Sequence, residues 1–425
     1  MTGTLSDVRL LRLATAGSVD DGKSTLVGRL LLDSDSVFAD QYDALAATGT
    51  VDLALLTDGL RAEREQGITI DVAYRYFSTA TRRFVLADTP GHVQYNRNTI
   101  SGMSAADVAV VLVDARRSVQ DQTRRHLATA ALLRVPHVAI AVNKMDAVDY
   151  QADRFTQVAE DVLGCAWQLG VADPVVIPVS ALAGDNIVRR SSTMDWYGGP
   201  TLLEHLERVP VTPIRSTGGA ARLSVQCVLK DDGGAGDVGR SYAGRLTSGP
   251  LAVGDEVVVL PSGRSTRVRA LGKLGAPVDS AFPGDSVEVT VADHVDVSRG
   301  DLIARPAAPS LVDSFRAVVC AVSERAVRPG EHVLVKHGTR TVRALLHEIH
   351  AGLDLASLRY LPGLGAVAGN DIALVTVRTA EPLPVEDHAD DRETGSFLLL
   401  DPDDGGTLAA GMVGAATDRR ADDPR

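Results

Sequence analysis

The chain has 425 residues, of which 23% are charged and 45% are hydrophobic, a composition typical of a globular protein with about two to four domains. The net charge is −12, but residues 381–425 hold twelve acidic and four basic side chains, so the rest of the chain is only mildly acidic. This balance argues against non-specific binding of nucleic acid, and we expect no nucleic-acid partner.

The cysteine spacing and the N-terminus argue against further classes of protein: disulfide-rich, zinc-binding, secreted and membrane proteins. The three cysteines lie far apart and form no C-x-x-C pair, so we expect three buried thiols and neither a disulfide framework nor a zinc site. The N-terminus lacks the pattern of a signal peptide, and no apolar run reaches about 18 residues. We therefore predict a cytoplasmic protein with no membrane partner.

The first motif lies between a predicted strand at residues 8–13 and a predicted helix at residues 26–32. Residues 17–24 fit the phosphate-loop pattern G-x-x-x-x-G-K-[ST] without a mismatch. Backbone N–H groups of such a loop point at an anion, and glycines let the backbone approach it closely. We expect Lys23 to reach the β- and γ-phosphates of a nucleotide and the Ser24 hydroxyl to bind Mg²⁺. The predicted phosphate-binding residues are Gly17, Ser18, Val19, Asp20, Asp21, Gly22, Lys23, Ser24 and Thr25, together with Gly91 of a later motif.

A polar region with few periodic signals follows at residues 33–67 and runs into R-E-Q-G-I-T-I at residues 64–70. Long polar loops inside compact domains are usually functional or disordered. After a phosphate loop we interpret this one as a nucleotide-sensing switch, with Thr69 as the candidate that binds Mg²⁺ and responds to the γ-phosphate. Taken alone, Ile-Thr-Ile is more often simply a strand.

A buried strand is predicted at residues 83–87 and is followed by D-T-P-G-H. Asp88 is placed to hold Mg²⁺ through a water, and Gly91 can offer its N–H to the γ-phosphate without steric hindrance. We expect His92 to orient the attacking water, the role that glutamine has in other GTPases. A lone histidine is more often structural, but its place directly after D-x-x-G favours the catalytic role.

Two later strands, predicted at residues 138–142 and 175–179, end in the motifs N-K-M-D and S-A-L. The Asp146 carboxylate can accept hydrogen bonds from N1–H and the N2 amine of guanine, two donors that adenine does not offer. A polar group left unpaired in this way typically favours the correct base over the wrong one by a factor of about 10⁴. We expect Asn143 to hold the neighbouring loops, Lys144 to cover the ring and the Ala181 N–H to meet guanine O6. The predicted guanine-binding residues are Asn143, Lys144, Asp146, Ser180, Ala181 and Leu182.

These strands alternate with helices, as in a further strand at residues 108–113 and a helix at residues 121–133, which predicts an α/β domain with a mostly parallel sheet. Each motif follows a strand, at the edge where such sheets bind ligands. The helical signal ends near Leu206. Beyond it, short strands and Gly/Pro/Asp turns recur about every ten residues and predict two small β-barrels, the second closed by a last strand at residues 397–400. The predicted domains are a GTP-binding domain at 1–212, barrels at 213–308 and 309–416, and a disordered tail at 417–425.

This arrangement, with G-x-V-D-x-G-K-S, R-E-x-G-I-T-I, D-T-P-G-H and N-K-M-D, resembles the translational GTPase class of elongation factor Tu over essentially the whole chain. Within that class, residues 17–24, 58–77, 114–126, 184–186 and 196–203 are similar to the large subunit of the bacterial heterodimeric sulfate adenylyltransferase. Translation factors usually have histidine where Ser18 and Asp21 stand. The sequence departs from the family pattern after His92, at Val93 and at residues 96–99.

The resemblance implies a GTPase that uses GTP and Mg²⁺ and couples GTP hydrolysis to ATP + sulfate → adenosine 5′-phosphosulfate + diphosphate. It also implies a partner, the small ATP-sulfurylase subunit that carries the adenylyl-transfer site. This chain has no S-G-G-x-D-S loop for that chemistry and no second phosphate loop for an adenylylsulfate kinase. The alternatives are a GTPase that delivers aminoacyl-tRNA, which would need a basic face on its barrels, and a stand-alone regulatory GTPase.

Overall fold

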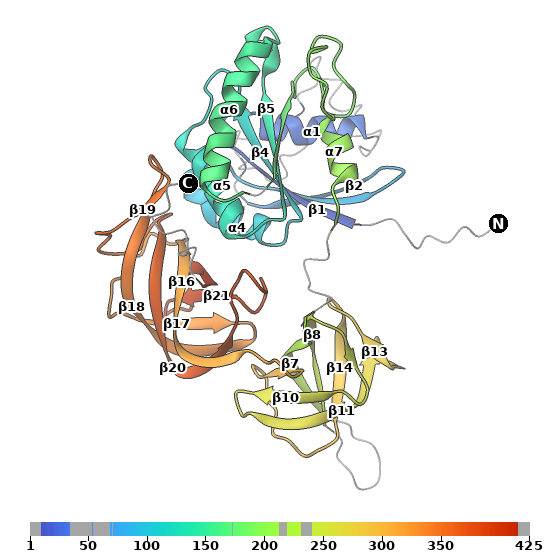
Figure 1. The fold of residues 1–425 in the computed structure, drawn as a ribbon, viewed down its shortest axis with the longest axis vertical. Helices are drawn as coiled ribbons and strands as arrows, with labels where there is room; N and C mark the ends of the chain where they lie inside the picture. The colour runs from blue at the N-terminus through green and yellow to red at the C-terminus, as the bar shows by residue number, and fades with distance from the viewer. Residues whose placement is uncertain are drawn as a thin grey trace, which may run out of the picture. The chain divides into compact units, whose positions relative to one another are not determined.

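The computed structural model describes residues 10–34, 53, 69, 71–171, 173–211, 219–230 and 240–414. Most of the polar region at 33–67 and the tail at 417–425 lie outside these residues, so the predictions made for them stay predictions. The chain divides into two compact units, residues 1–212 with 355–359 and residues 213–354 with 360–425. Figure 1 shows the elements of both.

The first unit is built on a six-stranded sheet in the order β2-β3-β1-β4-β5-β6. β1 pairs in parallel with β3 and β4, β4 with β5, and β5 with β6, while β2 runs antiparallel to β3. Every residue of β4 is buried, as expected for a central strand covered on both faces. The prediction of a mostly parallel sheet is therefore confirmed. The strands are β1 (Leu10–Ala16), β2 (Ala73–Ser78), β3 (Arg83–Asp88), β4 (Val108–Asp114), β5 (His137–Asn143) and β6 (Pro174–Pro178).

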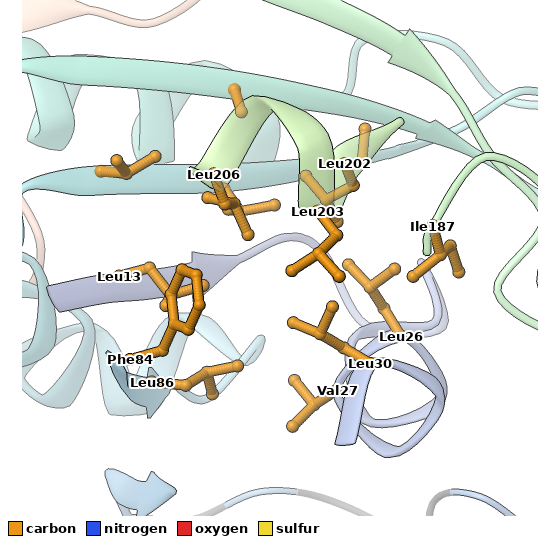
Figure 2. Packing of buried hydrophobic residues seen from close by; sticks show 14 of the residues in the cluster. Leu13, Leu26, Val27, Leu30, Phe84, Leu86, Ile187, Leu202, Leu203 and Leu206 are labelled. Carbon is orange, nitrogen blue, oxygen red and sulfur yellow. The ribbon is translucent and has the colours of Figure 1, made fainter. Parts of the chain in front are cut away.

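Helices cover both faces of this sheet, with α4, α5 and α6 on one side and α1 and α7 on the other (Figure 1). Figure 2 shows Leu203 of α7 pointing towards Leu26 and Leu30 of α1, with Leu206 of α7 and Phe84 of β3 in the same buried cluster. This core fixes α1, and therefore the loop that precedes it, against the sheet. The helices are α1 (Lys23–Asp33), α4 (Asn96–Ser104), α5 (Asp121–Leu132), α6 (Ala152–Gln168) and α7 (Leu202–Arg208), with short 3₁₀ helices η2 (Val93–Tyr95) and η3 (Met145–Val148).

The second unit contains two closed antiparallel barrels, as predicted. In the first, β10 pairs with both β15 and β11, which closes the order β10-β15-β7-β8-β14-β11 into a ring. In the second, β17 pairs with both β21 and β18, which closes β17-β21-β22-β16-β20-β18. The sheet of the first barrel consists of β7 (Arg222–Lys230), β8 (Arg240–Ser248), β10 (Glu256–Leu260), β11 (Arg264–Lys273), β12 (Ala276–Val278), β14 (Ser286–Val291) and β15 (Leu302–Ala304). β9 (Leu251–Ala252) and β13 (Ser280–Ala281) pair with each other in a separate two-stranded sheet. The second consists of β16 (Ser310–Ala321), β17 (His332–His337), β18 (Arg340–Asp354), β19 (Arg359–Leu361), β20 (Ile372–Val385), β21 (Ser396–Leu400) and β22 (Thr407–Val413).

The last strand of the second barrel differs from the prediction. The run at residues 397–400 is indeed a strand, β21, but β22 follows it and lies between β21 and β16. The sequence of β22, T-L-A-A-G-M-V, consists largely of small residues and lacks the β-branched run that signals a strand. Gly411 suits this place because a Cβ there would lie 2.2 Å from Cζ of the buried Phe397.

The three cysteines are free, as expected, but the prediction that all three are buried is wrong for two of them. Cys320 is buried, Cys165 is half-buried and Cys227 is exposed. The pairing of β7 with β8 shifts its register between Val225 and Cys227. This irregularity interrupts the alternation of inward and outward side chains, so Cys227 faces solvent.

Candidate nucleotide-binding site

The predicted motifs meet at one edge of the first unit's sheet. The phosphate loop at residues 17–22 follows β1, Asp88 is the last residue of β3, Asn143 is the last residue of β5, and Ser180 comes shortly after β6. Because β1, β3, β5 and β6 run in the same direction, their carboxyl ends lie at the same edge. Such an edge is where sheets of this kind bind ligands.

The phosphate loop is tightly folded between β1 and α1. Gly22 caps α1 with a φ of 89°, a left-handed conformation that favours glycine. A Cβ on Gly17 would lie 3.0 Å from Leu112 Cβ, so this residue lets the loop lie directly against β4. The carboxylate of Asp21 is only 2% exposed and accepts a hydrogen bond from the Ser18 N–H at 2.6 Å. The loop is therefore held closed by one of its own side chains.

Lys23 begins α1 and is 8% exposed, with its Nζ donating to the Gly17 carbonyl at 3.1 Å. Burial lowers the pKa of Lys23, although the carboxylates of Asp88 and Asp21 oppose this. Gly91 lies directly against this group, since a Cβ there would be 2.4 Å from Lys23 Nζ and 2.9 Å from the Gly17 carbonyl. A buried cation beside a loop with room only for backbone fits the phosphates of a nucleotide.

The candidate metal ligands have surroundings that fit a hard cation. Asp88 is 1% exposed, and its Oδ1 accepts a hydrogen bond from the Thr15 hydroxyl at 2.9 Å. Ser24 and Thr25 are half-buried in the first turn of α1. A carboxylate, a hydroxyl and phosphate oxygens together match the oxygen ligands that Mg²⁺ prefers. Thr69 is half-buried, but residues 54–68 and 70 lie outside the described part of the chain, so its role stays a prediction.

His92 lies at the start of η2 and lines a cavity of about 640 Å³. The phosphate-loop residues Ser18 and Val19, and Gln122 of α5, line the same cavity. Within the described part of the chain, the His92 Nε2, the Ser18 Oγ and the Gln122 Oε1 are buried atoms without a hydrogen-bond partner. Polar atoms of this kind around a cavity are suited to hold water or a polar ligand. His92 therefore lies beside the phosphate loop, and its Nε2 is buried without a hydrogen-bond partner among the described residues.

Asn143 joins two of the loops. Its Nδ2 donates to the Asp21 carbonyl of the phosphate loop at 2.7 Å, and its Oδ1 accepts from the Ala181 N–H at 2.9 Å. The Ala181 N–H, predicted to meet guanine O6, thus already has a protein acceptor. Ser180 donates from its hydroxyl to Asp146 Oδ1 at 2.5 Å, which orients that carboxylate. Leu182 is 69% exposed at the tip of this turn.

Lys144 is held by an acidic residue that sequence reasoning missed. Its Nζ lies 3.2 Å from Asp114 Oδ2 and also donates to the carbonyl of the exposed Asp20. Asp114 is 1% exposed; burial alone would raise its pKa, but hydrogen bonds from Arg116 and Lys144 outweigh burial and lower it to about 2. The sequence held a signal for it, because Asp114 ends the apolar strand β4 just as Asp88 ends β3.

Three further residues that support the guanine side were also missed. The Asn186 amide is 1% exposed and donates to the Pro178 carbonyl at 3.0 Å. The Trp196 indole N–H donates to the Tyr150 carbonyl at 3.0 Å, just beyond η3. Arg29 of α1 donates to the carbonyls of Ala181 and Leu182. Asn186 and Trp196 lie in runs that resemble the sulfate adenylyltransferase subunit, whereas no motif signals Arg29.

Comparison with known proteins defines the class first. The family model described as "Elongation factor Tu GTP binding domain" matches residues 8–211, and the one described as "GTP-eEF1A C-terminal domain-like" matches residues 314–414. The first unit is thus a GTP-binding domain of the elongation factor Tu type. Within the described ranges, no helix is long and apolar enough to cross a membrane.

The full-length relatives are more specific. The chain is 48% identical to the "Bifunctional enzyme CysN/CysC" of Mycobacterium tuberculosis, covering 95% of this chain and 67% of that protein. It is 42% identical to "Sulfate adenylyltransferase subunit 1" of Cellvibrio japonicus and 42% identical to the same subunit of Bacteroides fragilis, covering in both cases 95% of this chain and 86% of that protein. The chain belongs to the family of sulfate adenylyltransferase subunit 1.

Proposed function

We propose that this chain binds GTP and couples its hydrolysis to the formation of adenosine 5′-phosphosulfate and diphosphate from ATP and sulfate. The observation that carries the proposal is that the Asn143 side chain hydrogen-bonds both to the phosphate loop and to the turn that bears Ala181. The chain that contains this site is a member of the sulfate adenylyltransferase subunit 1 family. A site built in this way places a base and its phosphates in fixed relative positions. The carboxylate of Asp146 selects guanine in this proposal.

The roles of the site residues follow from their contacts. The backbone of residues 17–25 and of Gly91 binds the phosphates, and Lys23 neutralises them. Ser24, Thr69 and Asp88 would hold Mg²⁺, with Asp88 acting through a water; the ion supplies neutralisation of the phosphate charge when bound. On the base side, Lys144 covers the ring and is kept in place by Asp114.

His92 is the proposed catalytic residue. Its Nε2 has no partner within the described part of the chain and lies at a cavity shared with the phosphate loop. From there the ring can accept a hydrogen bond from the attacking water and direct its oxygen towards the γ-phosphate. Ser18 and Gln122 line the same cavity, and the Ser18 hydroxyl and the Gln122 amide oxygen are likewise buried without a hydrogen-bond partner among the described residues.

We propose domain boundaries at residues 1–212 for the GTP-binding domain, 213–308 and 309–416 for the barrels, and 417–425 for the tail. The division of the chain after residue 212 supports the first boundary. The match of residues 314–414 to a separate family model supports treating the second barrel as its own domain. Limited proteolysis should cut near these boundaries.

The proposed partner is a small subunit that carries adenylyl transfer. This chain offers one recognisable phosphate loop, and its base side is built for guanine, so ATP needs a site on another chain. The test is co-purification with the small subunit, followed by measurement of adenosine 5′-phosphosulfate with and without GTP. We expect no product from this chain alone, product with the partner, and more product with GTP. Product from the purified single chain would contradict the proposal, and so would a partner that leaves GTP affinity and turnover unchanged.

A further inference from the structure

The turn at residues 180–184, which bears the S-A-L motif, is held by three separate elements. From η3, Asp146 accepts from the Ser180 hydroxyl at 2.5 Å. From β5, Asn143 accepts from the Ala181 N–H at 2.9 Å. From α1, Arg29 binds the outer side of the turn through two consecutive backbone carbonyls. The turn is thus fixed through a side chain, an N–H and two carbonyls.

The Arg29 guanidinium makes both carbonyl contacts through its forked edge. Its Nε donates to the Ala181 carbonyl at 3.3 Å, and its Nη2 donates to the Leu182 carbonyl at 2.6 Å. Its Nη1 lies 3.6 Å from the carboxylate of Asp33, one helical turn further along α1. The aliphatic part of Arg29 also lies beside Gly184, because a Cβ on that residue would be 3.5 Å from Arg29 Cδ. The planar fork is suited to two neighbouring acceptors, whereas the single ammonium of lysine is not.

Carbonyl binding on one side determines where the amide hydrogens point on the other. In a planar trans peptide, the N–H of a residue points opposite to the carbonyl of the residue before it. Because Arg29 binds the Ala181 carbonyl, the Leu182 N–H is directed away from α1. The Ala181 N–H already donates to Asn143. The Leu182 N–H is therefore the donor of this turn that is best placed for an acceptor on the base.

Arg29 also connects the two halves of the site. Lys23 and Ser24 lie in the first turn of the same helix, so α1 carries the phosphate side at its start and the base side two turns later. The second connection runs through Asn143, whose Nδ2 donates to the Asp21 carbonyl at 2.7 Å. The phosphate loop and the S-A-L turn are thus linked by a helix on one side and by an asparagine on the other.

We infer that Arg29 is a positioning residue for guanine recognition, which holds the S-A-L turn so that the Leu182 N–H faces O6 of the base. The inference rests on the proposed function and deepens it. Arg29 acts through the backbone of the turn and not by touching the nucleotide. Its loss should weaken recognition of O6 while leaving the phosphate loop intact.

The test compares Arg29→Ala and Arg29→Lys with wild type for binding of GTP, inosine triphosphate and inorganic tripolyphosphate. Inosine triphosphate keeps O6 but lacks the N2 amine that Asp146 accepts. We expect Arg29→Ala to raise the Kd of GTP and of inosine triphosphate by the same factor, roughly tenfold, because about two charge-assisted hydrogen bonds no longer hold the turn. The Kd of tripolyphosphate should change less than about twofold by the same reasoning.

Two variants separate positioning from a general structural role. Arg29→Lys can bind one carbonyl and should recover part of the GTP affinity. Asp33→Asn, the matched control, removes the neighbouring charge but leaves both carbonyl contacts and should bind GTP as wild type does. Unchanged Kd values in Arg29→Ala, or an equal loss for tripolyphosphate, would overturn the inference and leave the proposed function standing. A wild-type protein that does not bind GTP would instead overturn the proposed function together with the inference.

Discussion

Replacement of Asn143 by alanine tests how strongly the two loops are held together. The side chain is 1% exposed, and both of its hydrogen bonds join it to backbone groups of Asp21 and Ala181, which are each 2% exposed. Asn143→Ala leaves a buried carbonyl and a buried N–H without partners. Each such group costs roughly 1–3 kcal/mol, so we expect the free energy of unfolding of the first unit to fall by about 2–4 kcal/mol, allowing for some entry of water.

Tryptophan fluorescence in a urea titration measures this change for the first unit alone. The chain has two tryptophans, Trp167 and Trp196, and both lie in that unit. Thr156→Ala is the matched control, because it also removes a hydrogen bond to a backbone carbonyl, but on the exposed surface of α6. It should shift stability by less than about 0.5 kcal/mol. The reasoning is refuted if Asn143→Ala unfolds at the same urea concentration as this control.

Three further predictions concern hydrolysis, base choice and pH. His92→Ala should lower kcat for GTP hydrolysis by about 10²-fold or more with little change in GTP affinity, because a residue that orients water acts mainly in the transition state. Rapid-quench turnover and equilibrium binding measure the two quantities. An equal loss of kcat and of GTP affinity would indicate a structural histidine. Asp146→Asn should shift binding from GTP towards xanthosine triphosphate, whose O2 can accept from the new amide; competition binding checks this, and retention of full GTP preference would show that Asp146 does not read the base. His126 is fully buried, and burial together with nearby Lys23 lowers its pKa from 6.5 to about 3. Below pH 6.5 the unfolded chain therefore binds a proton that the folded chain does not bind. The free energy of unfolding of the first unit should fall by up to about 1.4 kcal/mol per pH unit as the pH falls from 6 to 4. Burial lowers the pKa of His205 as well and contributes with the same sign; urea titrations of wild type and His126→Gln should differ by one proton in this slope, and parallel slopes would contradict the assignment.

The parts of the site that could be predicted from the sequence are those where a strand ends in a motif. Asp88 and Asn143 could be placed because apolar strands precede them, and the parallel sheet brings strand ends to one edge. The same reasoning applied to β4 would have added Asp114. Helix α6 was also open to prediction, because Val158, Val162 and Ala166 are buried at helical spacing.

Other parts had no sequence signal to follow. Arg29 binds backbone carbonyls, and every residue type has a carbonyl, so the sequence does not mark its partners. β20 continues to Val385 through two prolines because Leu383 is fully buried in the barrel core, which an acidic and proline-containing stretch does not suggest. In both cases tertiary packing decides what local composition leaves open.

The closed rings of the two barrels restrict how another protein can bind there. Among the described strands, each ring strand pairs on both sides over at least part of its length, which limits the edge to which a foreign strand could add to places where a strand runs past a neighbour, as residues 310–315 of β16 run past β22. The short strands β9, β12, β13 and β19 lie outside the rings, and each is two or three residues long. The sheet of the first unit is different: among the described strands, β2 pairs with β3 alone and carries Tyr74 and Tyr76 at 52% and 72% exposure. A protein that docks on the closed parts of the rings must therefore recognise side chains and turns, whereas β2, at the edge of the first unit's sheet, is placed for main-chain pairing with a partner strand.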